Sequence, residues 1–331
     1  MTLLKSCLGA TAALALTAGA ALADPAIIYD LGGKFDKSFN ESAFGGATRW
    51  ATETGGTFAE AELQSDAQRE QALRRFAEAG SNPIVMAGFS FGTALTEVAA
   101  DYPDTKFVII DMVVDAPNVR SVVFNEHEGS YLVGMLAAMA SQTGTVGFIG
   151  GMDIPLIRKF ACGYAQGVLA ANPDATIVAN MTGTTFAAFN DPVKGSELTL
   201  AQIAQGVDVV YAAAGGTGVG VLQTAADNDI LSIGVDANQN YLHPGEVLTS
   251  MLKRVDNAVY EAMTAGVDVE TGINVMGIGN GGVGYALDEF NAALITPEMQ
   301  AAVDAASAAI AAGTLVVHDY TSDETCPALT F

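Results

Sequence analysis

Short apolar runs alternate with stretches of helical periodicity along most of the chain. Ala26–Tyr29 is a continuous apolar run, which is typical of a strand buried on both faces. The stretch from Ser38 to about Thr52 predicts a helix because its apolar residues share one helical face: Phe39, Ala43, Phe44, Ala47 and Trp50. Ser38 and Glu41 have the spacing of a capping box at the start of this helix.

The same alternation continues to about residue 279. It predicts helices over 67–79, 91–100, 129–141, 155–171, 193–205, 217–228 and 255–265. It predicts strands over 83–89, 106–111, 121–125, 145–150, 176–182, 207–214, 231–236, 247–253 and 272–279. Strands that alternate with helices in this way predict parallel sheets with helices on both faces, the α/β class.

Two sets of this alternation favour two doubly wound lobes, because the chain is longer than one hydrophobic core usually accommodates. A glycine-containing turn at Gln142–Gly144 separates the two sets. We therefore expect an N-terminal lobe made of 24–142 plus about 254–272, and a C-terminal lobe made of 143–253 plus about 273–331.

The first 23 residues have the features of a cleaved secretory signal peptide. Lys5 supplies the positive start, Leu8–Leu22 supplies the apolar segment, and small residues lead up to a cleavage site after Ala23. Cys7 precedes the apolar segment, whereas an acylated cysteine would follow it. We therefore expect secretion into the periplasm without a lipid anchor.

Charge and cysteine content narrow the possible partners. The formal charge is −23 at pH 7, and loss of Lys5 with the leader makes it −24. Such an acidic surface repels nucleic acid and anionic lipid, so neither is an expected partner. Cleavage leaves Cys162 and Cys326, which in an oxidising compartment would form one disulfide or remain as two free thiols.

The residues that follow the predicted strands are the candidates for a binding site, because ligands of open α/β sheets bind outside the carboxyl ends of the strands. These residues are Asp30, Gly88, Phe89, Asp111, Gly215, Asp236 and Lys253, with Phe186 and Phe189 in the loop after 176–182. Aromatic faces stack on flat rings, carboxylates accept hydrogen bonds from N–H groups and hydroxyls, and glycines allow close approach. Each aspartate could instead cap a helix, Phe39 could belong to the core, and Lys253 could be a solvated surface charge.

Several segments, taken together, resemble the basic membrane protein family of purine nucleoside-binding proteins, which serve ABC importers. The most specific is Phe35-Asp36-Lys37-Ser38-Phe39-Asn40-Glu41-Ser42-Ala43. It is followed in the same order by 100–104 with Phe107 and Asp111, by 128–134, 146–151 and Gly215–Gly218, and by 234–236 and 249–253. The resemblance covers nearly all of the mature chain. It implies a type I periplasmic-binding-protein fold, in which two Rossmann-like lobes joined by a three-stranded hinge close on a ligand.

The resemblance also implies a role for each matching residue. Asp30 would hydrogen-bond the base, Asn40 would support the site, and Phe39 would sandwich the base with Phe189 or with Phe186. The ribose or its surroundings would be contacted by Asp111, Gly215, Asp236 and Lys253. No cofactor, metal or catalytic residue is implied, and the expected partner is the permease of an ABC transporter. Many members carry a lipobox cysteine at the mature N-terminus, and this chain departs from them in that respect.

Three other functions compete with nucleoside binding. The same fold could bind a sugar or another small polar metabolite, although a carboxylate ligand is disfavoured because the candidate loops contain no arginine. The chain could be the ligand-sensing component of a receptor. An enzyme is disfavoured because His127, His243 and His318 have no metal-ligand spacing and no nucleophile motif occurs. We expect a monomer.

Overall fold

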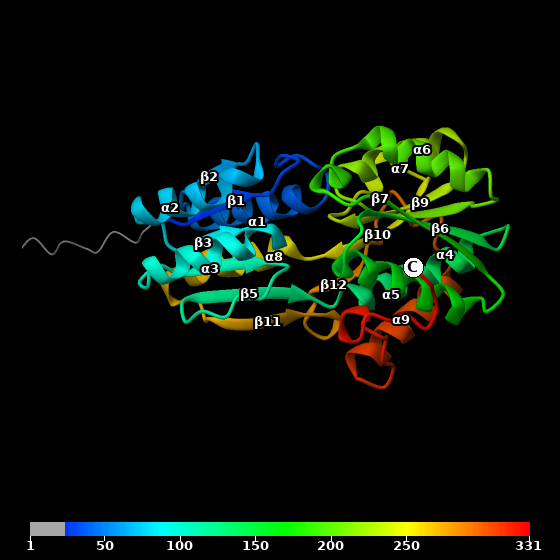
Figure 1. Ribbon diagram of the computed structural model, residues 1–331. Coiled ribbons are helices and arrows are strands. Elements are labelled where there is room, and N and C mark those ends of the chain that lie inside the picture. The colour runs from blue at the N-terminus through cyan, green and yellow to red at the C-terminus, as the bar shows by residue number, and fades with distance from the viewer. Residues whose placement is uncertain (1–23) are drawn as a thin grey trace, which may run out of the picture.

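Two six-stranded sheets, each with helices packed on its faces, divide the protein into two lobes that lie side by side (Figure 1). The computed structural model describes residues 24–331, so the predicted leader at 1–23 lies outside the described residues. The α/β class and the two-lobed architecture predicted from the alternating pattern are confirmed.

The sheet of the first lobe is parallel throughout and has the strand order β11-β5-β4-β3-β1-β2. Its strands are β1 (Ala26–Tyr29), β2 (Ala59–Glu62), β3 (Ile84–Met86), β4 (Phe107–Ile110), β5 (Val119–Phe124) and β11 (Gly272–Met276). Its helices are α1 (Phe39–Thr54), α2 (Arg69–Glu78), α3 (Gly92–Asp101) and α8 (Val255–Ala265). All residues of β1, β3 and β4 are buried, which explains their continuous apolar sequences.

The sheet of the second lobe has the order β12-β10-β9-β8-β6-β7, and only the β10–β12 pair is antiparallel. Its strands are β6 (Thr145–Met152), β7 (Thr176–Gly183), β8 (Val209–Ala213), β9 (Leu231–Asp236), β10 (Val247–Lys253) and β12 (Val283–Tyr285). Its helices are α4 (Glu126–Ala140), α5 (Pro155–Ala171), α6 (Pro192–Ile203), α7 (Thr217–Asp227) and α9 (Pro297–Ala311). The sequence pattern did not predict β2, β12 or α9.

The chain crosses between the lobes three times, and the crossing segments lie next to one another. The Asn125 N–H donates to the Met276 carbonyl, and the Arg254 N–H donates to the Gly282 carbonyl, both at 2.8 Å. The crossings therefore fall between β5 and α4, between β10 and α8, and between β11 and β12.

Two segments lie in the other lobe from the one that we expected. Helix α4 was assigned with 24–142 to the N-terminal lobe, but it packs on α5, β10, β12 and α9 of the second lobe. Residues 273–276 were assigned to the C-terminal lobe, but they belong to β11, which pairs with β5 of the first sheet. Both differences have one cause: an apolar face indicates that a segment is buried, but it does not indicate which sheet buries the segment.

Helix α1 begins without the predicted capping box. Asp36 takes the capping role, since its carboxylate accepts hydrogen bonds from the backbone N–H groups of Ser38, Asn40 and Glu41 at 2.9–3.0 Å. The Glu41 carboxylate accepts from the Lys37 N–H instead of the Ser38 N–H. The Ser38 hydroxyl is therefore free to reach the second lobe.

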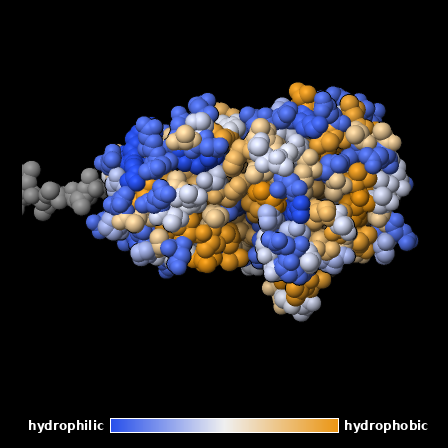
Figure 2. Space-filling view, in the orientation of Figure 1, coloured by the Kyte–Doolittle hydropathy of each residue, from blue (hydrophilic) through white to orange (hydrophobic). Residues whose placement is uncertain are grey.

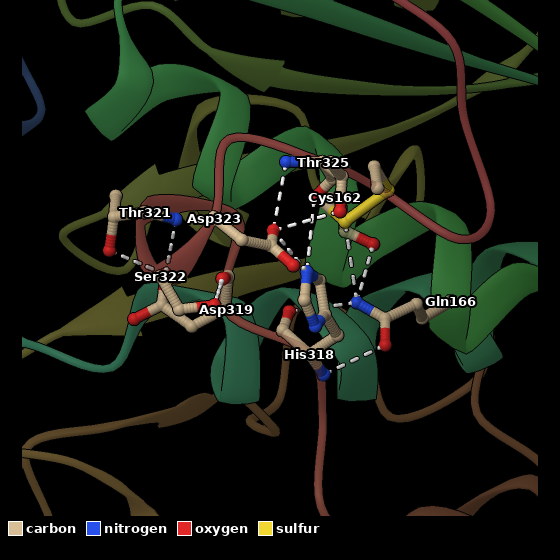
Figure 3. Close-up of a disulfide and its surroundings, with 9 residues drawn as sticks. Cys162, Gln166, His318, Asp319, Thr321, Ser322, Asp323 and Thr325 are labelled. Atoms are coloured by element: carbon tan, nitrogen blue, oxygen red, sulfur yellow. Dashed lines mark hydrogen bonds and ion pairs between the residues drawn. A yellow bond between two sulfur atoms is a disulfide. The ribbon is translucent and has the colours of Figure 1, made fainter.

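A disulfide joins Cys162 of α5 to Cys326 in the C-terminal segment, with 5.6 Å between the Cα atoms (Figure 3). Beside it, the Gln166 side chain accepts from the His318 N–H at 2.8 Å and donates to the His318 carbonyl at 3.0 Å. The C-terminal segment is thus fixed to α5 both covalently and by hydrogen bonds. Both cysteines lie in the second lobe, so the bond does not link the two lobes.

The outer surface mixes hydrophilic and hydrophobic areas (Figure 2). One hydrophobic area in that view lies over the region where Figure 1 places β5 and β11, and Ile273 and Val275 of β11 are exposed. Within residues 24–331, none of the helices is both long and apolar enough to cross a membrane.

Candidate ligand-binding site between the two lobes

A cavity lies between the lobes at the carboxyl ends of the strands. All ten predicted site residues line it: Asp30, Phe39, Asn40, Gly88, Phe89, Asp111, Phe189, Gly215, Asp236 and Lys253. They come from the ends of β1, β3, β4, β8, β9 and β10, from the first turn of α1, and from the short 3₁₀ helices Phe89–Phe91 and Phe186–Phe189. The strand-end rule thus brings together residues that are far apart in the sequence.

Asp30 is held in place by a dense set of donors. Its Oδ1 accepts from the Leu31 N–H at 2.8 Å and from Arg69 Nη2 at 2.7 Å, and its Oδ2 accepts from the Ser90 hydroxyl. The Asn40 amide fixes the backbone beside it, donating to the Asp30 carbonyl and accepting from the Asp30 N–H, both at 3.2 Å. Asn40 therefore supports the loop that carries Asp30.

Gly88 is required by this arrangement. Its φ of 126° lies in the region that side chains rarely adopt, and a Cβ atom there would sit 2.5 Å from Asp30 Oδ2. A side chain at position 88 would displace the carboxylate from the cavity wall.

One arginine lies behind the site although the candidate loops contain none: Arg69 is buried next to Asp30. It stands at the start of α2, which the strand-end search did not cover. Its guanidinium also pairs with Asp66, so its charge is already shared between two carboxylates. The site still offers no free arginine for an anionic ligand.

Lys253 is buried, and it lies at the centre of a charged cluster. Its Nζ is 2.6 Å from Asp111 Oδ2 and 3.0 Å from Glu126 Oε1, and its side chain is only 2% exposed. The rings of Phe39, Phe124 and Phe160 surround the ammonium at 5.1–5.5 Å from their centroids. The alternative interpretation of Lys253 as a solvated surface charge is therefore wrong.

The cluster continues away from the cavity. Glu126 Oε2 is 3.1 Å from Lys159 Nζ, and Lys159 Nζ is 3.5 Å from Asp319 in the C-terminal segment. Burial alone would raise the pKa of Glu126, but the charges of Lys253 and Lys159 outweigh burial and lower the pKa. Neither Glu126 nor Lys159 was predicted as a site residue, because each lies on a helix at a position typical of an ordinary surface charge.

Asp111 and Asp236, two acids at strand ends, have raised pKa values, in contrast to Glu126. Burial raises the pKa of Asp111 to about 6 against the opposing charge of Lys253. Burial also raises the pKa of Asp236 to about 7, although Lys253 and the Ser38 hydroxyl, 2.6 Å from Oδ2, act to lower the pKa. Both residues have left-handed backbone, with φ of 70° and 63°, a cost that tends to be retained at functional positions.

Aromatic and apolar side chains complete the walls. Phe189 packs closely against Gly151, where a Cβ atom would come within 2.3 Å of the ring. Phe186 also lines the cavity, and its ring stacks on Phe89 at 5.2 Å between centroids and 23° between planes. Both candidate phenylalanines of this loop therefore lie at the cavity. The sequence prediction missed further lining residues: Leu31, Gly32, Asp36, Leu156, Ile157, Phe160, Ala213 and Val235.

Some of these residues could have been found. Leu156, Ile157 and Phe160 follow β6, and the strand-end rule applied to β6 would have pointed to the start of α5. Among residues 24–331, no group of three or more His, Cys, Asp and Glu side chains is placed to hold a metal ion.

Two α/β lobes that enclose a cavity between their strand ends define the class of two-lobed solute-binding proteins, and known structures agree. A solute-binding protein of an ABC transporter system from Aeropyrum pernix has a TM-score of 0.81 and 30% identity, with 89% of this chain and 94% of that chain covered. The ABC transporter nucleoside-binding protein BmpA of Lactococcus lactis is 33% identical, with 88% of each chain covered. An uncharacterized lipoprotein of Pyrococcus furiosus is 35% identical over 78% of this chain and 69% of that protein.

The family described as ABC transporter substrate-binding protein PnrA-like, Bmp, matches residues 25–308. The chain belongs to this family. The resemblance that rested on short segments is thereby confirmed, and the chain is an ABC transporter substrate-binding protein.

Proposed function

We propose that the cavity binds a purine nucleoside and that the protein delivers it to the permease of an ABC importer. BmpA of Lactococcus lactis is named as a nucleoside-binding protein, and the lining of the cavity offers matching chemistry. A nucleoside combines an apolar flat ring with a ribose that carries two neighbouring hydroxyl donors, and the cavity is lined by both aromatic rings and carboxylates.

One observation carries the proposal: Asp111 Oδ1 is buried and, among the described residues, has no hydrogen-bond partner. A buried acceptor without a donor costs about 1–3 kcal/mol. A ribose hydroxyl would supply the missing donor, and Asp236 on the neighbouring wall would accept from the second hydroxyl. Lys253 would stabilise the negative charge of Asp111 while it accepts.

The base would lie next to the ribose, on the side of the cavity that carries Asp30. Phe39 and Phe189 would stack on its two faces, and Asp30 would accept from a ring N–H. Asp30 Oδ1 already accepts two hydrogen bonds, whereas Oδ2 accepts only the Ser90 hydroxyl among the described residues. Oδ2 is therefore the atom that would receive the ring N–H.

We place the protein on the outer side of the cytoplasmic membrane, in the periplasm if the leader is cleaved after Ala23. Several relatives are named as lipoproteins, so mass spectrometry of the N-terminus of the exported protein decides between a free and an acylated form. The proposed working form is a monomer that binds no nucleic acid.

The direct test is calorimetric titration of refolded protein, from which any carried ligand has been removed. Adenosine, guanosine, inosine, cytidine, adenine and ribose are compared. A purine nucleoside is expected to bind at micromolar concentration or below, while ribose alone gives no heat. Binding of ribose without nucleosides would favour a sugar-binding protein, and silence toward all six ligands from folded protein would refute the nucleoside proposal.

Asp111→Asn gives the residue-level test. The amide retains the shape of the side chain but replaces one acceptor with a donor, so nucleoside affinity should fall more than the affinity for free adenine. Equal losses for the two ligands would remove Asp111 from the ribose subsite. Asp115→Asn, an exposed aspartate in the following loop, is the matched control.

A further inference from the structure

The stack of Phe89 on Phe186 joins the two lobes. Phe89 belongs to the first lobe, directly after β3, and Phe186 belongs to the loop after β7 of the second lobe. The two rings are parallel enough, at 23°, and close enough, at 5.2 Å, to form an offset stack. A movement that opens the cleft between the lobes would separate the two rings.

Arg69 adds a second contact across the same gap. Its guanidinium carbon lies 5.0 Å from the centroid of Phe186 and 5.5 Å from that of Phe91. The same guanidinium donates to Asp30 in the cavity wall. Arg69 therefore connects a cavity-lining carboxylate of one lobe to an aromatic ring of the other.

The loop that carries Phe186 is anchored on one side. The Ala188 carbonyl accepts from the hydroxyls of Thr182 and Thr217, both at 2.8 Å, which fixes the end of the loop to the second lobe. Thr184, Thr185 and Ala187 are exposed, whereas Phe186 between them is half-buried. The burial of Phe186 is explained by its contacts with first-lobe side chains.

Phe186 also separates two cavities. The ligand cavity and an outer, solvent-open cavity share Phe186, Leu31 and Gly32 in their walls. The outer cavity is further lined by Gly33, Leu63, Gln64, Ala187 and Asn190, so it lies between the lobes at the cleft edge. Phe186 is the one aromatic side chain that the two cavity walls share.

We propose that Phe89, Arg69 and Phe186 form an aromatic latch that holds the lobes closed without ligand and limits the rate of ligand release. Stacking and cation–π contacts of this kind favour the state that contains them by about tenfold, which corresponds to about 1.4 kcal/mol. The contacts are formed by the protein alone, so the latch does not depend on which ligand is bound. The opening rate, more than the closing rate, should respond to its loss.

The latch can be tested in ligand-free protein by single-molecule energy transfer. Dyes are attached to Glu97→Cys on α3 and Gln223→Cys on α7, two exposed positions in different lobes, while the native cysteines remain in their disulfide. The time spent in the closed state is compared before and after Phe186→Ala. The closed dwell time should become about tenfold shorter.

Two further variants make the result specific. Phe290→Ala removes a partly exposed ring of the second lobe outside the cavity lining, and it should leave the closed dwell time unchanged. Phe186→Tyr retains the stacking ring, and it should restore the dwell time of the parent protein. An unchanged dwell time in Phe186→Ala, or a parent protein that never closes without ligand, would overturn the latch.

The outcome is independent of the nucleoside proposal. If inosine does not bind but Phe186→Ala still shortens the closed dwell time, the nucleoside proposal is refuted and the latch is supported. If inosine binds, its release followed by stopped-flow should accelerate about tenfold in Phe186→Ala, and an unchanged release rate would remove the latch from control of release.

Discussion

Replacement of Lys253 by methionine should destabilise the protein strongly at neutral pH. Methionine fits among the three phenylalanine rings and retains sulfur–aromatic contacts, so packing changes little. The loss comes from Asp111, which has its one ion pair, at 2.6 Å, with Lys253, whereas Glu126 keeps Lys159 at 3.1 Å. Removing one partner of a buried ion pair costs about 3–5 kcal/mol, which we take as the expected loss at about pH 7.

The loss should depend on pH in a defined direction. The native pKa of Asp111, about 6, is raised above that of the unfolded chain, so the native state binds this proton more tightly than the unfolded state does. The stability that comes from this proton is lost as the pH rises through the native pKa. Without Lys253 the pKa rises further, and the native variant must bind a proton at pH values where the parent binds none. Each additional pH unit costs about 1.4 kcal/mol. The loss should therefore be about 1.4 kcal/mol larger at about pH 7 than at about pH 5.

Urea unfolding followed by circular dichroism measures both quantities. Lys194→Met is the matched control, because Lys194 forms a well-exposed pair with Glu197 at 3.3 Å and such pairs contribute about 0–1 kcal/mol. A loss below about 1 kcal/mol for Lys253→Met, or a loss that is larger at acidic pH, would refute the assignment of Lys253 as the cation that balances the buried acids.

Three further predictions concern the site and the disulfide. Phe39→Ala should weaken inosine binding by about 1–3 kcal/mol because one stacking face is lost. Phe35→Ala, at an exposed ring nearby, should leave inosine binding unchanged, and equal effects of the two variants would remove Phe39 from the base subsite. Inosine should bind about twentyfold more weakly at about pH 6 than at about pH 8, because Asp236, with a pKa of about 7, and Asp111, with a pKa of about 6, must both be ionised to accept the hydroxyls. Asp236→Asn should reduce this dependence to about twofold, the part that Asp111 contributes. An undiminished pH dependence in Asp236→Asn would assign the titration to another group. Cys326→Ser should lower the free energy of unfolding by about 3–5 kcal/mol, since the disulfide joins residues 164 positions apart. The closed dwell time of the lobes should not change, and a shorter dwell time would contradict the confinement of the disulfide to one lobe.

The fold was predictable because its signal is local. Buried parallel strands produce continuous apolar runs, and β1, β9, β10 and α8 begin and end in the structure where the sequence pattern placed them. The strand β2 was missed because its sequence, Ala-Glu-Ala-Glu, is too polar to resemble a core strand. It lies at an edge of the sheet, where half of its residues face solvent.

The site was predictable to the extent that one rule governs it. Residues that end parallel strands meet at one edge of a sheet, and this rule placed Asp30, Asp111 and Asp236 at one cavity. The rule is silent about side chains that arrive from helices, so Arg69 and Glu126 were not found. The pairing of Ser38 with Asp236 across the cleft depends on how the two lobes meet, and no local pattern contains that information.

The three crossings also determine when the protein can complete its fold. The first sheet lacks its edge strand until the chain as far as Met276 is available for folding, although its other strands end with Phe124. At that moment the second lobe still lacks β12, α9 and Cys326. Because both lobes need segments from the last part of the chain, neither can be complete before that part is available for folding.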